Sequence, residues 1–113
     1  MITLYGIKAC DTVKKARHYL DANNVDFNYH DFRINGLEKD KLSDWIKAVG
    51  WKVLLNTRST SWRQLTDKQK QDIDENSALA LMMDNPTLIK RPVLETSTEV
   101  IVGFKAEDYQ QVS

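Results

Sequence analysis

The sequence predicts an α/β protein built on a mixed β-sheet, and two patterns carry that prediction. Near the start, an alternating strand, an amphipathic helix and a second alternating strand follow one another within roughly 30 residues, the length of a βαβ unit with parallel strands. Near the end, two short apolar runs flank the turn "TST" and predict an antiparallel hairpin. A sheet that contains both units is mixed.

The first βαβ unit is predicted element by element. The segment "ITLY" alternates apolar and polar side chains and ends at Gly6, as a short strand does. A helix follows over about 11–23, because its apolar residues recur at helical spacing: Val13, Ala16 and Leu20. The segment "VDFNYHDF" alternates again and predicts the second strand.

Helices are predicted through the middle of the chain. One shows an apolar stripe and closes at Gly50: Leu42, Trp45, Ile46 and Val49. Thr66 with Gln69 suggests a capping box for the next, and a helix over about 77–83 stops before Pro86, which cannot continue it. After the hairpin, "AEDYQQV" predicts a closing helix.

This order of elements fits a thioredoxin-like fold with a helical insertion, in which helices flank a four-stranded mixed sheet. The length of 113 residues is enough for one hydrophobic core. We therefore expect a single domain over 1–113, with a core formed by 1–35 and 86–113 and a helical insertion over about 37–85.

Composition narrows the function classes. The chain has 16 basic and 16 acidic residues and thus a formal charge of zero, so no global field favours nucleic acid or an anionic membrane. It has no long apolar run and no basic leader before one, which predicts a soluble, cytoplasmic protein. The four glycines are isolated, so we expect no nucleotide site. One cysteine with two histidines makes neither a disulfide within the chain nor a metal site.

Cys10 is the only cysteine, and it lies where the first strand gives way to the first helix. Position alone leaves two interpretations open. The thiol is either a small packed hydrophobe or a reactive thiolate, stabilised by the helix start and by the lysines near it in the sequence. For the second interpretation we expect the backbone N–H groups of Cys10 and Asp11 to stabilise the thiolate, with Lys8 among the cations nearby.

Four segments make the chain recognisable: "ITLYGIKACDTVKKARHYL", "LLNTRSTSWRQL", "LIKRPVL" and "VGFKAEDY". In this order and spacing they resemble the arsenate reductase (ArsC) family of thioredoxin-like proteins, which also includes Spx-type transcription regulators. The likeness extends over essentially the whole chain. It is strongest to the YffB-like branch of glutathione-dependent thiol reductases.

The resemblance implies roles for individual residues. Cys10 matches the family's nucleophile, and Arg58 in "NTRS" and Arg91 in "KRP" match two oxyanion-binding arginines, a role that suits the guanidinium fork. Asp11 and Lys8 complete the predicted set of substrate- and anion-binding residues. The resemblance also implies a cis peptide bond before Pro92, although only about 5 to 6% of X-Pro bonds are cis.

Two departures from arsenate reductases favour a thiol substrate. Those enzymes carry "HNPxC" before the nucleophile, whereas this chain has "GIKAC", with Gly6 in the histidine's place. Where they carry a third arginine, this chain has Phe104. We therefore predict a thiol–disulfide reductase with glutathione as co-substrate and a small oxyanion or an oxidised thiol as substrate. Glutaredoxin is a candidate partner. The alternative is an Spx-like regulator that binds RNA polymerase, although the chain lacks the C-x-x-C of Spx redox switches.

Overall fold

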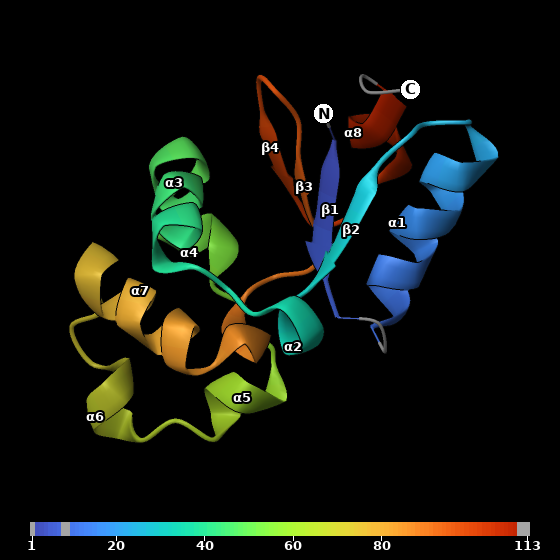
Figure 1. Ribbon diagram of the computed structural model, residues 1–113. Coiled ribbons are helices and arrows are strands. Elements are labelled where there is room, and N and C mark those ends of the chain that lie inside the picture. The colour runs from blue at the N-terminus through green and yellow to red at the C-terminus, as the bar shows by residue number, and fades with distance from the viewer. Residues whose placement is uncertain (1, 8–9, 111–113) are drawn as a thin grey trace. The chain divides into compact units, whose positions relative to one another are not determined.

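The computed structural model describes residues 2–7 and 10–110 and shows an α/β protein with one four-stranded mixed sheet (Figure 1). The strand order is β2-β1-β3-β4. β1 runs parallel to β2, whereas β3 is antiparallel to both β1 and β4. The strands are β1 (Thr3–Gly6), β2 (Asn28–Asp31), β3 (Val93–Glu95) and β4 (Val100–Val102). The predicted parallel pair and antiparallel hairpin are both confirmed.

The chain forms two compact units, one from Met1–Gly36 with Arg91–Ser113 and the other from Leu37–Lys90. The first unit holds the whole sheet, and the named elements of the second are all helices, joined by turns and loops. Among the described residues, no helix is long and apolar enough to cross a membrane. The assignment of the chain to a single domain stays a prediction.

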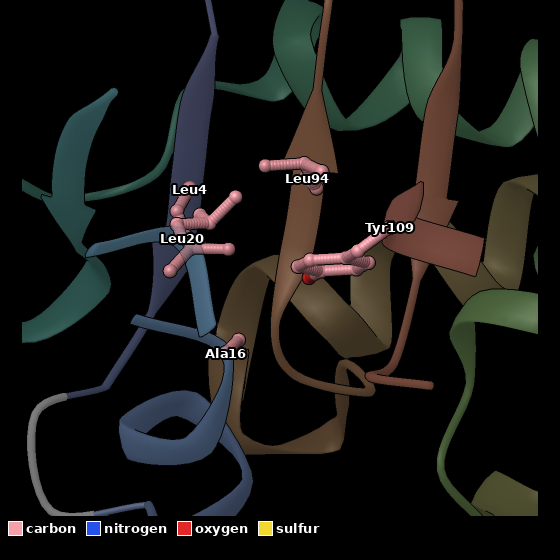
Figure 2. Close-up of a cluster of buried hydrophobic side chains, with 5 residues drawn as sticks. All are labelled: Leu4, Ala16, Leu20, Leu94 and Tyr109. Carbon is pink, nitrogen blue, oxygen red and sulfur yellow. The ribbon is translucent and has the colours of Figure 1, made fainter. Parts of the chain in front are cut away.

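In the sheet unit, α1 (Asp11–Ala22) and α8 (Ala106–Tyr109) share one hydrophobic core with the central strands. Leu4 of β1 pairs with Leu94 of β3, and helix side chains cover both of them (Figure 2). The fully buried members of this core are Leu4, Ala16, Leu20, Leu94 and Tyr109. The helical spacing of Ala16 and Leu20 correctly predicted which face of α1 is buried.

The second strand is shorter than the segment "VDFNYHDF" that the sequence predicted for it. β2 begins only at Asn28, because the Val25 N–H donates to the Leu20 carbonyl at 3.0 Å and so helps close the turn after α1. A short helix that the sequence did not predict, α2 (Phe32–Asn35), follows directly. The buried Asp31 side chain begins this helix by accepting the Arg33 N–H at 2.8 Å.

The helical unit contains α3 (Lys39–Val49), α4 (Trp51–Leu54), α5 (Thr60–Arg63), α6 (Asp67–Lys70), α7 (Glu75–Asp84) and the 3₁₀ helix η1 (Pro86–Leu88). The capping box of Thr66 with Gln69 is confirmed at α6. α7 begins two residues before its predicted start, because Asp74 and Ser77 form a second capping box. The closing helix α8 covers only the start of its predicted range, and residues 111 and 112 lie outside the described part.

The hydroxyl group of Tyr109 is a polar group inside the hydrophobic core of the sheet unit. Its side chain is fully buried, and within the described ranges its hydroxyl has no hydrogen-bond partner. A buried polar group without a partner costs about 1–3 kcal/mol. We therefore expect Tyr109→Phe to raise the free energy of unfolding by about 1 kcal/mol in urea denaturation. Tyr19→Phe, which removes the hydroxyl of a half-buried ring, should change it by less than about 0.5 kcal/mol.

The same variant has a pH signature. Burial, and after it the Asp108 carboxylate, raises the pKa of Tyr109 above its ordinary value of 10.0. As the pH rises through 10, the unfolded chain releases this proton while the folded chain keeps it, so the fold loses stability in alkali. In Tyr109→Phe, the part of this loss of stability that comes from the Tyr109 hydroxyl should be absent. A variant less stable than wild type at neutral pH would mean that the hydroxyl has a partner, such as a buried water.

Candidate active site

Cys10 is the N-cap residue of α1, with extended backbone angles of −80° and 123°. Its N–H donates to the Ile7 carbonyl at 3.0 Å, and its own carbonyl accepts the Lys14 N–H at 3.1 Å. These two bonds fix the residue between the end of β1 and the first turn of α1. Cys10 is partly exposed within this structure.

The surroundings of Cys10 favour the thiolate. Burial alone would raise the pKa of the thiol, but the Val13 N–H, the Arg91 side chain and the Thr12 N–H each stabilise the charged sulfur. Their combined effect exceeds that of burial, and the pKa lies below its ordinary value of 9.0. A thiolate is the nucleophilic form of cysteine. This environment fits the reactive interpretation of Cys10 better than the packed one.

The backbone N–H groups at the sulfur are not those that the sequence suggested. The N–H of Cys10 is already bonded to Ile7, so its predicted role is wrong. The N–H groups that lower the pKa of the thiol belong to Val13 and Thr12, in the first turn of α1. The part predicted for Asp11 stays a prediction, and Lys8 lies outside the described residues.

Arg91 reaches Cys10 because of the strand pairing. Val93 of β3 lies opposite Tyr5 of the antiparallel β1, so the residues that precede Val93 lie beside the carboxyl end of β1, where the chain leads to the thiol. The Arg91–Pro92 peptide bond is cis, the isomer that the resemblance implies. Next to it, the Pro92 carbonyl accepts the Gly103 N–H at 2.8 Å and ties this corner to the hairpin.

Gly6 allows α1 to approach the end of β1 closely. A Cβ at this position would lie 2.6 Å from Cγ2 and 3.1 Å from Cγ1 of Val13. Val13 is fully buried and stiff at χ1 because it is β-branched. No larger residue, a histidine included, fits at Gly6 unless the first turn of α1 moves. The turn that carries the Val13 N–H toward the thiol therefore depends on this glycine.

Arg58 belongs to the helical unit, in a tight turn before α5. Its N–H donates to Oδ1 of Asn56 at 3.1 Å, and the Asn56 carbonyl accepts the hydroxyl of Ser59 at 2.9 Å. The Arg58 side chain is exposed, and its use together with Cys10 stays a prediction. The structure thus brings together Cys10, Arg91 and Pro92 within the sheet unit.

Sequence reasoning missed two side chains of β2 near Cys10, those of Tyr29 and Asp31. The Tyr29 hydroxyl donates to Oδ2 of Asp31 at 3.5 Å, and the Arg17 guanidinium lies 4.4 Å from the centre of the Tyr29 ring. Burial, and after it the Asp31 carboxylate, raises the pKa of Tyr29, and Cys10 contributes least. Because β1 and β2 are parallel, Asp31 lies beside Gly6. The strand alternation was the only signal for these residues.

A partly exposed cysteine with a lowered pKa at the end of a central strand, and a cis-proline just before the neighbouring strand, fit a thioredoxin-like protein. The sequence profile of the ArsC family matches residues 5–112. This chain therefore belongs to the ArsC family.

Individual relatives agree with that assignment. An uncharacterised protein of Haemophilus influenzae is 44% identical over 110 residues, which are 97% of this chain and 96% of that one. The global transcriptional regulator Spx of Streptococcus pyogenes is 26% identical over 110 residues, which are 96% of this chain and 81% of the regulator.

Solved structures show the same fold. A protein called YFFB is 44% identical and superposes with a TM-score of 0.96 over 99% of this chain and 98% of its own. An arsenate reductase (ArsC) related protein from Brucella melitensis is 41% identical, with a TM-score of 0.79 over 97% of this chain and 92% of its own. The fold and family predicted from the sequence are confirmed.

Proposed function

We propose that this protein is a thiol–disulfide oxidoreductase that uses Cys10 as its nucleophile and glutathione as its reductant. The observation that carries the proposal is the partly exposed Cys10 thiol, whose pKa is lowered by the first turn of α1 and by Arg91. Catalytic cysteines need this combination of thiolate character and access.

The proposed reaction consists of three disulfide exchanges, the last of which releases Cys10. The Cys10 thiolate attacks one sulfur of a substrate disulfide, that bond breaks, and one half leaves as a thiolate. A glutathione thiolate then attacks Sγ of Cys10 and expels the other half. A second glutathione attacks the glutathione sulfur, which frees Cys10 and forms glutathione disulfide. Two glutathiones are oxidised for each substrate disulfide reduced.

The arginines have a role in binding under this proposal. A guanidinium binds a carboxylate through two parallel hydrogen bonds, so Arg91 and Arg58 would hold the carboxylates of glutathione or of an anionic substrate. The close contact of Gly6 with Val13 supports a thiol substrate over arsenate, because the site has no room for the histidine that arsenate reductases carry there. Glutaredoxin is a candidate partner that could supply the second thiol.

Two measurements test the proposal. The rate of Cys10 alkylation against pH should show a midpoint below 9.0, the ordinary value for the thiol. Incubation with glutathione disulfide should add one glutathione to the wild-type protein, seen by mass spectrometry, and none to Cys10→Ser. A midpoint at or above 9.0 would rule out a catalytic thiol. If alkylation is fast and the glutathione adduct does not form, glutathione is the wrong reductant.

A regulator is the second candidate, because the relative from Streptococcus pyogenes that matches 96% of this chain is a transcriptional regulator. An Spx-like role requires a stable complex with RNA polymerase. A pull-down with purified polymerase separates the two functions, since the oxidoreductase should not be retained. A retained complex that survives in Cys10→Ser would favour the regulator.

A further inference from the structure

A groove of about 470 Å³ runs along the outer side of α1 in the sheet unit. Its lining comes from one face of the helix and from the segment that leads into α8: Lys14, Lys15, His18, Tyr19, Ala22 and Phe104. The opposite face of α1 carries the buried Ala16 and Leu20. The helix therefore presents a second surface, which the other described residues of the sheet unit leave uncovered.

The floor of the groove is aromatic and firmly supported. The Tyr19 and Phe104 rings lie 5.7 Å apart, and both pack on the buried ring of Tyr109, at 5.9 Å and 4.9 Å between centroids. Rings held in such tilted and edge-to-face contacts form a stable apolar platform. An apolar side chain of a partner would find a preformed surface on it.

The rim of the groove is basic. Lys14, Lys15 and His18 are exposed on α1, and no acidic side chain appears among the described residues that line the groove. The chain as a whole has a net charge of zero, so this positive rim is a local feature. An occupant that matches the groove carries acidic groups as well as apolar ones.

The groove begins one helical turn from the thiol, since the Lys14 N–H is bonded to the Cys10 carbonyl. From Lys14 to Ala22, α1 rises about 12 Å, which about four extended residues span. A peptide joined to Cys10 by a disulfide could therefore lie along it.

We propose that this groove binds the polypeptide next to an oxidised cysteine in a protein substrate, and that it selects segments with acidic and apolar side chains. The inference rests on the proposed disulfide exchange at Cys10 and names its substrate class. In the first exchange, the attacked sulfur belongs to the substrate cysteine, the disulfide to Cys10 forms on it, and the other half leaves as a thiolate.

Peptide mixed disulfides with thionitrobenzoate test the proposal in a single turnover. The probes are the peptides Cys-Leu-Glu-Phe-Glu, Cys-Leu-Lys-Phe-Lys and Cys-Ser-Glu-Ser-Glu. Attack by Cys10 on the peptide sulfur releases the coloured thionitrobenzoate thiolate. For each probe, the rate with the protein is divided by the rate of the same probe with free cysteine, which removes its intrinsic reactivity. This ratio is then divided by the corresponding ratio for the mercaptoethanol mixed disulfide. We expect the first peptide to exceed each of the other two by about tenfold.

Variants place the selection in the groove. Lys14→Glu with Lys15→Glu should reverse the preference between the acidic and the basic peptide, whereas Lys47→Glu with Lys68→Glu, a matched change on exposed residues of α3 and α6, should leave it intact. Ala22→Trp, which fills one end of the groove, should reduce the advantage of the apolar peptide over the serine peptide.

The outcomes separate this inference from the proposed function. If all three peptides react equally after normalisation, the groove selects no polypeptide and the inference fails, while exchange at Cys10 stands. If the mercaptoethanol disulfide itself does not react, the proposed function fails. Sedimentation of the protein alone tests a second copy as the occupant, since a dimer that Ala22→Trp dissociates would overturn the inference.

Discussion

Gly6→Ala is expected to lower the stability of the fold and, with it, the reactivity of the thiol. The new Cβ would lie 2.6 Å from Cγ2 of Val13, which is well inside van der Waals contact. Overpacking of this kind costs about 1–3 kcal/mol. The first turn of α1 must move to relieve it, and that turn carries the Val13 N–H that stabilises the Cys10 thiolate. The pKa of Cys10 should therefore rise toward 9.0.

A double-mutant cycle with Val13→Ala isolates this contact. Val13→Ala removes both Cγ atoms and leaves Cβ, at an ordinary distance of 3.4 Å from the added methyl. Val13→Ala alone leaves a cavity and costs stability, but Gly6→Ala should cost little more in its presence. Urea denaturation gives the coupling, and alkylation against pH gives the thiol pKa. Effects that add within about 0.5 kcal/mol, or a thiol pKa that does not change in Gly6→Ala, would contradict the predicted contact.

Arg91→Ala should have the largest effect on reactivity at neutral pH. The guanidinium lowers the pKa of Cys10 both by a hydrogen bond to the sulfur and by its charge. Without it, the balance moves toward burial, which raises the pKa, so the rate–pH profile should move to higher pH. Where the thiol is mostly protonated, a higher pKa leaves less thiolate at neutral pH, so the rate there should fall several-fold. Reactivity at high pH, where every thiol is ionised, should recover.

Arg91→Lys and Lys47→Ala serve as controls. The lysine keeps the positive charge and loses the planar fork, so its thiol pKa should lie between those of wild type and Arg91→Ala. Lys47→Ala removes one exposed charge from α3 and should leave the profile in place. A parallel loss of rate at every pH in Arg91→Ala would mean that the arginine binds the reactant without stabilising the thiolate.

Periodicity predicted the larger elements because they bury a continuous stripe. α1 and α3 each turn a run of apolar residues toward a core, and Leu20 and Trp45 are buried as their spacing implied. Capping chemistry predicted the start of α6 as well. The helices that sequence reasoning missed, such as α4 and α5, have four residues each, too few for a period to be visible.

The candidate site was predictable in identity and less so in geometry. The position of Cys10 and the motif around Arg91 pointed to the residues that meet in the sheet unit. The N–H groups that lower the thiol pKa were harder to foresee, because the N–H of Cys10 is bonded to Ile7 and the Val13 N–H lowers the pKa in its stead. The demand for glycine at position 6 depends on packing between two elements, and no local pattern encodes such a distance.

The sheet unit combines two segments that are far apart in the sequence, with Cys10 in the earlier one and Arg91 in the later one. During synthesis the cysteine leaves the ribosome first, and most of the chain follows before β3 can pair with β1. A nascent or truncated chain therefore holds a thiol that lacks the guanidinium's effect on its pKa. Arg91 lowers the thiol pKa only after β3 has paired with β1 and has brought the guanidinium beside Cys10.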